Sequence, residues 1–139
     1  MSGEGIIRFI GIVDEAGEVS VIKIFPKYLK GLRGITDFSH LIIIYWFDRR
    51  DTTSYRETLV VMPRMHRAKE MVGVFASRSP SRPNPLGLCV VELVKVESDK
   101  LYVKELDALE GTPIVDVKPY IPNADALLDA RIPEWASQD

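Results

Sequence analysis

The stretch that decides the fold is Leu41-Ile42-Ile43-Ile44-Tyr45-Trp46-Phe47. All of its side chains are apolar, no polar residue alternates with them, and the middle of the run is β-branched. Such a pattern is typical either of a strand covered on both faces or of a barrel strand. We therefore expect residues 41–47 to form the central strand of the fold.

Charged residues follow this run directly, in the order Asp48, Arg49, Arg50, Asp51. Ligand groups often sit at the carboxyl end of a buried strand. A charge run in this position more commonly marks the return of the chain to solvent. The position by itself leaves both interpretations open.

Two pairs of β-rich segments flank the central strand, and each pair predicts a hairpin. Residues 6–13 and 18–25 are rich in β-branched and aromatic side chains and are separated by the turn residues 14–17. Residues 88–96 and 101–106 are separated by Glu-Ser-Asp-Lys in the same way. These segments add four expected strands to the central one.

The remaining segments are short. Residues 58–62 and 114–118 are expected strands, 27–32 at most a helical turn or two, 52–57 a loop and 124–130 a short helix. Neither a Gly-x-Gly-x-x-Gly turn nor alternating long helices occur, which disfavours a Rossmann fold. The sequence thus predicts one mainly β domain over residues 1–139, a small antiparallel β-barrel with one or two short helices.

Composition bears on the cellular location of the protein and on whether it holds disulfides or a metal. The single cysteine, Cys89, excludes an internal disulfide framework, and with only two histidines beside it a Cys/His metal site is disfavoured. No apolar stretch approaches the length of a membrane span, and the first residues lack the pattern of a signal peptide. We expect a cytoplasmic protein without a metal or a membrane.

Charge is unevenly distributed along the chain. The formal net charge is -2, yet residues 49–82 hold eight basic and three acidic side chains. Local fields, more than net charge, attract polyanions to a protein surface. An RNA partner therefore stays open, although ordinary solvated charges explain the same count.

Residues 73–87 read Gly-Val-Phe-Ala-Ser-Arg-Ser-Pro-Ser-Arg-Pro-Asn-Pro-Leu-Gly. The three prolines fix their own φ and favour extended geometry before them, so the segment is expected to be a stiff loop. Arg78, Arg82 and Asn84 carry groups suited to carboxylates, phosphates or base edges, and a loop ordered in advance lowers the entropy cost of binding. The plain alternative is a surface connection whose arginines are solvated.

Three segments together resemble one known family. Residues 73–88, residues 106–120 (Leu-Asp-Ala-Leu-Glu-Gly-Thr-Pro-Ile-Val-Asp-Val-Lys-Pro-Tyr) and the run from Phe38 to Phe47 closely resemble the TsaA-like family, also called YaeB or TrmO. The resemblance implies a β-barrel that binds S-adenosylmethionine without a Rossmann fold, usually as a homodimer. It implies methylation of the N6 nitrogen of N6-threonylcarbamoyladenosine, next to the anticodon of certain tRNAs.

The resemblance also implies roles for particular residues. The family's cofactor contacts fall on Asp48, Arg49, Arg78, Leu88, Asp107, Ala108, Leu109 and Glu110. Arg82 and Asn84 are expected to face the tRNA, together with the loop that carries Arg64, Arg67 and Lys69. The catalytic base stays unassigned: Asp116 is a candidate and Tyr120 a weaker one, and Asp116 has the simpler explanation of pairing with Lys118 or a backbone donor.

Two of the chain's departures from the family pattern lie in the expected cofactor region. The segment after the first strand is shorter than in family members and lacks a Ser-Pro pair, and Asp48 stands where many relatives have histidine. The shorter segment favours an alternative in which the barrel is a non-catalytic module that binds S-adenosylmethionine or RNA. A third possibility, an RNA-binding barrel without a cofactor, is disfavoured because few aromatic residues accompany the basic segment.

Overall fold

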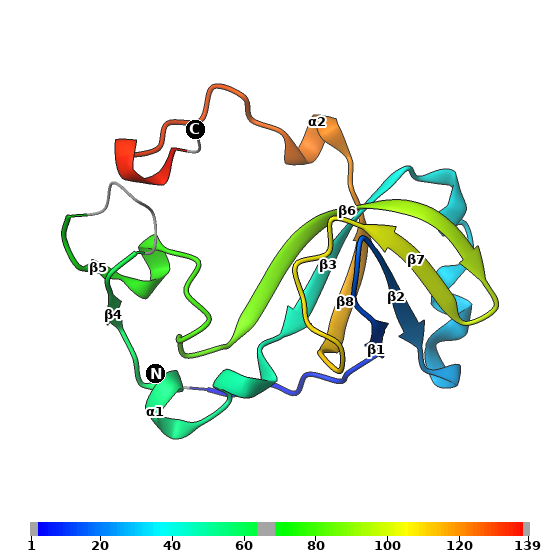
Figure 1. Ribbon diagram of the computed structural model, residues 1–139, viewed down its shortest axis with the longest axis horizontal. Coiled ribbons are helices and arrows are strands. Elements are labelled where there is room, and N and C mark those ends of the chain that lie inside the picture. The colour runs from blue at the N-terminus through cyan, green and yellow to red at the C-terminus, as the bar shows by residue number, and fades with distance from the viewer. Residues whose placement is uncertain (1–2, 64–68, 138–139) are drawn as a thin grey trace. The chain divides into compact units, whose positions relative to one another are not determined.

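The fold is known from a computed structural model that describes residues 3–63 and 69–137 (Figure 1). The chain divides into two compact units. The first, the barrel unit, comprises residues 1–48 and 86–120, and the second, the loop unit, comprises residues 49–85 and 121–139. The expectation of one domain over residues 1–139 stays a prediction. Within the described residues, no helix is long and apolar enough to cross a membrane.

The barrel unit is a closed barrel of six antiparallel strands in the order β1-β2-β7-β6-β3-β8. This confirms the predicted mainly β class and the barrel architecture. The strands are β1 (Gly11–Glu15), β2 (Val19–Ile24), β3 (His40–Trp46), β6 (Leu86–Glu97), β7 (Lys100–Lys104) and β8 (Pro113–Pro119). Two 3-10 helices, η1 (Pro26–Leu32) and η2 (Ile35–Asp37), lie between β2 and β3 in the chain.

Strand β3 has the central place that its sequence predicts. It pairs with β6 along one side and with β8 along the other. The side chains of Leu41, Ile43 and Tyr45 are buried, whereas Ile42 and Ile44 are only half-buried. Because burial alternates along the strand, β3 is a barrel strand and is not equally covered on both faces.

The barrel interior is filled by branched aliphatic side chains. Its core cluster consists of Val13, Ile22, Ile24, Leu41, Ile43, Tyr45, Val91, Leu101, Val103 and Ile114. Alternate residues of each strand supply these side chains, since successive side chains of a strand point to opposite faces. The core is therefore built from residues that are far apart in the sequence.

The loop unit contains only short elements. They are α1 (Thr53–Arg56), β4 (Val60–Val61), β5 (Val72–Gly73), η4 (Val74–Ala76), α2 (Pro122–Asp125) and η5 (Glu134–Ala136). A further 3-10 helix, η3 (Asp48–Arg50), begins at Asp48, the last residue of the barrel unit's first segment. Strands β4 and β5 pair with each other as a small antiparallel sheet. Much of the rest, including the proline-rich segment, is irregular, as predicted.

Three sequence-based expectations are wrong in detail. Residues 6–10 are not part of the first strand, which begins at Gly11; Phe9 instead lies with its ring 6.0 Å from that of Trp46. Residues 53–56 are helical, because the Thr52 hydroxyl accepts a hydrogen bond from the Tyr55 amide and caps the turn. The expected helix over residues 124–130 is displaced to Pro122–Asp125, where proline occupies the first turn.

Candidate functional site

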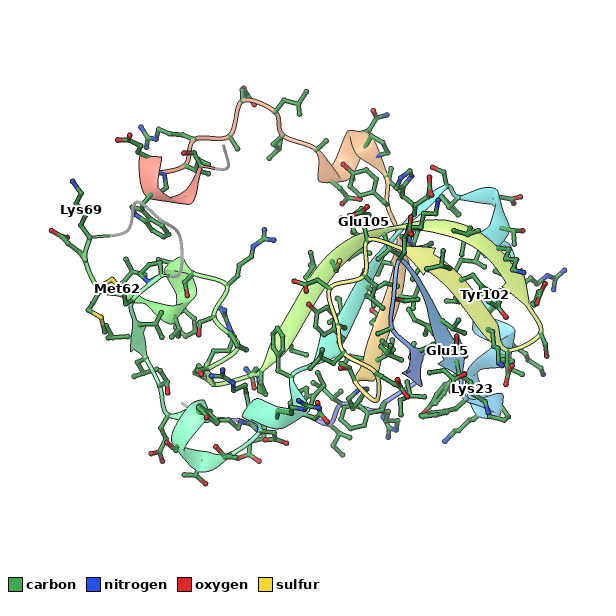
Figure 2. All side chains as sticks on the ribbon, in the orientation of Figure 1. Glu15, Lys23, Met62, Lys69, Tyr102 and Glu105 are labelled. Atoms are coloured by element: carbon green, nitrogen blue, oxygen red, sulfur yellow. The ribbon has the colours of Figure 1, made fainter. Side chains whose placement is uncertain are left out.

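One group of predicted site residues lies on the turn between β7 and β8. Strand β7 ends at Lys104, two residues before the expected end at residue 106, because Glu105 adopts a φ of 71°. The turn that follows ends at Gly111, which has a φ of 89°. The backbone amide of Gly111 donates to the carbonyl of Val13 at 2.8 Å, and that of Thr112 donates to Leu109 at 3.1 Å. The turn has a defined backbone. Glu105 is labelled in Figure 2.

Side chains of this turn divide between the core and the solvent. Leu106 and Ala108 are half-buried and pack against the core cluster. Asp107, Leu109 and Glu110 are exposed. The turn therefore uses its alternate residues as anchors and presents two carboxylates and one apolar side chain to solvent.

Two side chains of the barrel wall hold the backbone of the turn. The Tyr45 hydroxyl donates a hydrogen bond to the carbonyl of Asp107 at 2.7 Å, and the Cys89 thiol lies 2.9 Å from the carbonyl of Glu105. Burial, the charge of Asp107 and the thiol of Cys89 raise the pKa of Tyr45 to about 12. The phenol is thus a hydrogen-bond donor throughout the neutral range. The sequence interpretation missed both contacts; a tyrosine with a polar tip inside an apolar strand was the available signal.

Asp48 and Leu88 are the other predicted site residues that belong to the barrel unit. Asp48 is exposed and follows β3 after Phe47. Leu88 lies on β6, is 52% exposed and pairs across the ladder with Ile44. An apolar side chain left half in water on a rigid strand is a suitable contact for an apolar ligand surface.

The proline-rich loop of the loop unit is braced by its own polar groups. Arg82 Nη1 donates to the carbonyls of Ser77 and Ser79, at 3.1 Å in each case. The Ser79 amide donates to the Ser77 hydroxyl, and the Ser81 amide donates to the Ser79 hydroxyl, at 3.2 Å each. The stiffness expected from the prolines is therefore reinforced by a chain of short-range hydrogen bonds.

Two further arginines, which the sequence interpretation did not connect with this loop, also hold it. Arg56 Nε donates to the Pro83 carbonyl at 2.8 Å, and its Nη1 lies 3.1 Å from Asp51 Oδ1. Arg56 Nη2 donates to Asn84 Oδ1 at 3.4 Å. The Arg50 guanidinium packs over the Tyr55 ring, with Cζ 4.6 Å from the ring centroid, and its Nη1 donates to the Ser81 hydroxyl at 2.7 Å. These contacts join residues that are distant in the chain, and no sequence pattern around Arg50 or Arg56 predicts them.

Arg78 differs from the arginines that brace the loop. It is exposed, and the described part of its unit offers it no hydrogen bond or ion pair. Arg49 and Asn84 are exposed as well. A guanidinium carried on a braced loop, with its donors available, is suited to bind an anionic group.

The other predicted residues stand as follows. Arg64 and Arg67 lie outside the described residues, and Lys69 is exposed (Figure 2). Asp116 pairs with Lys118 at 3.1 Å and accepts a hydrogen bond from the Val117 amide at 2.9 Å, which is the simpler explanation for this carboxylate. Among the described residues, no cluster of three or more His, Cys, Asp or Glu side chains is suited to hold a metal ion.

Comparison with known proteins identifies the family. Residues 12–126 match the tRNA-methyltransferase O N-terminal domain. The chain belongs to this family. A probable S-adenosyl-L-methionine-binding protein of Archaeoglobus fulgidus is 48% identical over 83% of this chain and 30% of its own length. The tRNA (adenine(37)-N6)-methyltransferase of Mus musculus is 40% identical over 74% of this chain and 23% of its own length.

The fold of the tRNA-methyltransferase O N-terminal domain is also found among solved structures. The crystal structure of TrmO from Pseudomonas aeruginosa aligns with a TM-score of 0.72 and 27% identity, over 93% of this chain and 61% of that chain. The chain thus spans less than two thirds of the length of this structure and less than one third of the A. fulgidus relative. The resemblance found in the sequence motifs is confirmed at the level of the family.

Proposed function

We propose that this protein is an S-adenosylmethionine-dependent methyltransferase that acts on tRNA. The observation that carries the proposal is the family match over residues 12–126, together with a 40% identical relative named for methylation of tRNA adenine at N6. The finer proposal is that the substrate is the N6 nitrogen of N6-threonylcarbamoyladenosine next to the anticodon. The residue motifs quoted from the sequence support this choice.

The residues that the family resemblance assigns to S-adenosylmethionine carry, in each unit taken by itself, groups that suit this cofactor. Arg78 supplies a cation for the carboxylate of the methionine part, and the exposed carboxylates of Asp107 and Glu110 accept hydrogen bonds from ribose hydroxyls or the α-amine. The apolar surface for the adenine comes from the exposed side chains of Leu88 and Leu109 and from the part of Ala108 that the core cluster leaves uncovered. Asp48 and Arg49 complete the proposed set as polar contacts.

The sulfonium of the cofactor supplies an already activated methyl group and leaves as a neutral thioether. The residues of this chain consequently have to bind the cofactor and the tRNA, orient the methyl group toward the acceptor nitrogen, and exclude water. Such positioning alone can raise the rate by several powers of ten. The turn of residues 107–110 is suited to this work because its backbone is hydrogen-bonded at both ends. A rigid site keeps donor and acceptor in line at little entropic cost.

Recognition of tRNA is proposed for the polar residues of the loop unit. Asn84 is exposed, and Arg82 keeps its charge at the loop while one nitrogen braces the backbone. Arg82 therefore contributes in two ways, as a phosphate contact and as a support for the loop. We further propose a cytoplasmic homodimer; the exposed apolar side chains of Leu88, Val90 and Val94 on β6 support self-association.

The test of the cofactor proposal is the variant Arg78→Ala. We expect it to abolish binding of S-adenosylmethionine in isothermal titration calorimetry, because no neutral side chain replaces the charge-assisted hydrogen bonds. Its circular dichroism and melting temperature should match the wild type, since Arg78 is exposed. Arg33→Ala, at an exposed arginine of the barrel unit, is the matched control and should bind as the wild type does. Wild-type affinity in Arg78→Ala would contradict the proposal.

A second candidate is a non-catalytic module that binds S-adenosylmethionine. The name of the A. fulgidus relative, which mentions binding and no reaction, favours it. Mass spectrometry of tRNA nucleosides from cells with and without the gene separates the two functions. Loss of the N6-methyl form of threonylcarbamoyladenosine supports the enzyme, whereas unchanged methylation with tight cofactor binding in vitro supports the module.

A further inference from the structure

Tyr45 connects the core of the barrel unit with the turn between β7 and β8. Its side chain belongs to the core cluster and is only 4% exposed, yet its hydroxyl reaches the backbone carbonyl of Asp107 at 2.7 Å. The two residues are 62 positions apart in the chain. A rigid strand at the centre of the fold is therefore connected directly to the turn that carries Asp107, Leu109 and Glu110.

The place of the Tyr45 ring is set by its neighbours. Phe47 packs edge-on against it with ring centroids 5.3 Å apart. Gly87 is its partner across the ladder with β6, and a Cβ atom at Gly87 would lie 2.5 Å from Tyr45 Cε2 and 2.6 Å from Cζ. Gly87 does not adopt a positive φ. This glycine of β6 therefore provides room for the Tyr45 ring.

A second contact holds the same turn one residue before Leu106. The Cys89 thiol donates to the carbonyl of Glu105, where the backbone takes its positive φ. The carbonyls of Glu105 and Asp107 are thus both bound by barrel side chains, from β6 and β3. Between them Leu106 packs on the core, so the start of the turn is held at three consecutive residues.

We propose that Tyr45 is a positioning residue for cofactor binding, acting by holding the Asp107 carbonyl so that the side chains of residues 107–110 keep one arrangement. The inference rests on the proposed function, because it assigns those side chains to S-adenosylmethionine. Tyr45 itself does not touch the cofactor in this proposal. It lowers the entropy that the turn loses when the ligand binds.

The test is the variant Tyr45→Phe, which removes one oxygen and keeps the ring that fills the core. Without cofactor, amide hydrogen exchange of Gly111 and Thr112 should accelerate about threefold to tenfold, the equivalent of one net hydrogen bond. Titration calorimetry should show a dissociation constant for S-adenosylmethionine raised by a similar factor. With saturating cofactor, kcat should stay unchanged, since only the binding of the cofactor is affected.

Tyr102→Phe is the matched control. Tyr102 lies half-buried on β7 of the same barrel, and Lys95 Nζ is 4.5 Å from its ring centroid. Within the described residues it makes no hydrogen bond or ring contact with the turn. This variant should leave the exchange of Gly111 and Thr112 and the cofactor affinity as in the wild type. Equal effects of both tyrosine variants would show a general loss of barrel stability and overturn the role of Tyr45.

The two measurements separate failure of this inference from failure of the proposed function. Unchanged exchange in Tyr45→Phe, or faster exchange with unchanged cofactor affinity, overturns the positioning role while the wild type still binds S-adenosylmethionine. A wild type that does not bind S-adenosylmethionine overturns the proposed function, and the cofactor role of Tyr45 with it. Faster exchange together with weaker binding supports both.

Discussion

The barrel unit and the loop unit are ordered by different forces. Of the fourteen described apolar side chains that are buried, proline included, twelve belong to the barrel unit and two, Val74 and Pro85, to the loop unit. The loop unit is ordered instead by hydrogen bonds that arginine side chains donate to its backbone carbonyls and that serine hydroxyls accept from its backbone amides. Hydrophobic burial supplies most of the folding free energy, whereas exposed polar contacts mainly select one local conformation.

This difference extends to the proposed cofactor residues. Asp107 and Glu110 are carried on a turn that is anchored to the core of the barrel through Tyr45. Arg78 is carried on a loop that is braced by Arg56 and Arg82 and contains few buried apolar groups. Side chains of the proposed site are thus positioned in two ways, by packing on the core and by polar bracing. Loss of core packing should lower the free energy of unfolding more than loss of a polar brace does.

The largest expected effect is in the barrel core. Ile43→Ala should lower the free energy of unfolding by about 2 to 5 kcal/mol, because Ile43 is fully buried within the core cluster and its removal leaves a cavity. Val74→Ala, the corresponding truncation in the loop unit, removes one carbon fewer and should cost about 1 to 2 kcal/mol. Urea unfolding followed by circular dichroism measures both. Equal losses would contradict the view that the barrel holds most of the core.

An intermediate effect is expected at alkaline pH. Tyr45 has its pKa raised in the folded protein to about 12, above its ordinary value of 10.0, so its contribution to stability is complete below pH 10 and is lost as the pH rises toward 12. Relative to Tyr45→Phe, the wild type should lose about 1 kcal/mol of unfolding free energy between pH 9 and pH 11. Urea titrations of both proteins at the two pH values give this difference. Parallel pH profiles would show that folding does not raise the pKa of the phenol.

The smallest effect on stability is expected from the brace of the loop unit. Arg56→Ala removes the contacts to Pro83 and Asn84 but no core side chain, so the unfolding free energy should change by less than about 1 kcal/mol. The proline-rich loop should nevertheless become several times more sensitive to limited proteolysis, because local order is lost. Arg33→Ala serves again as the control. A large drop in stability, with an intact loop, would mean that polar bracing is not what orders this unit.

Much of the fold could be predicted because its signals are local. The apolar run of residues 41–47, the two β-rich pairs and the turn residues between them predict the strands of the barrel, and the prolines predict an irregular segment. Boundaries were less predictable. The end of β7 depends on the positive φ of Glu105, and helix α1 depends on the Thr52 cap, and neither is marked by composition.

For the candidate site, the sequence by itself determined which chemical groups are available: the guanidiniums of the proline-rich loop, the carboxylates of residues 107–110 and the family to which the chain belongs. Only the tertiary structure decided which of these groups are engaged internally. Arg82 and Arg56 brace the loop while Arg78 stays exposed, and Tyr45 reaches Asp107 across 62 residues. The physical reason is that hydrogen bonds and packing depend on distances in space, and residues far apart in a chain become neighbours only when the barrel closes.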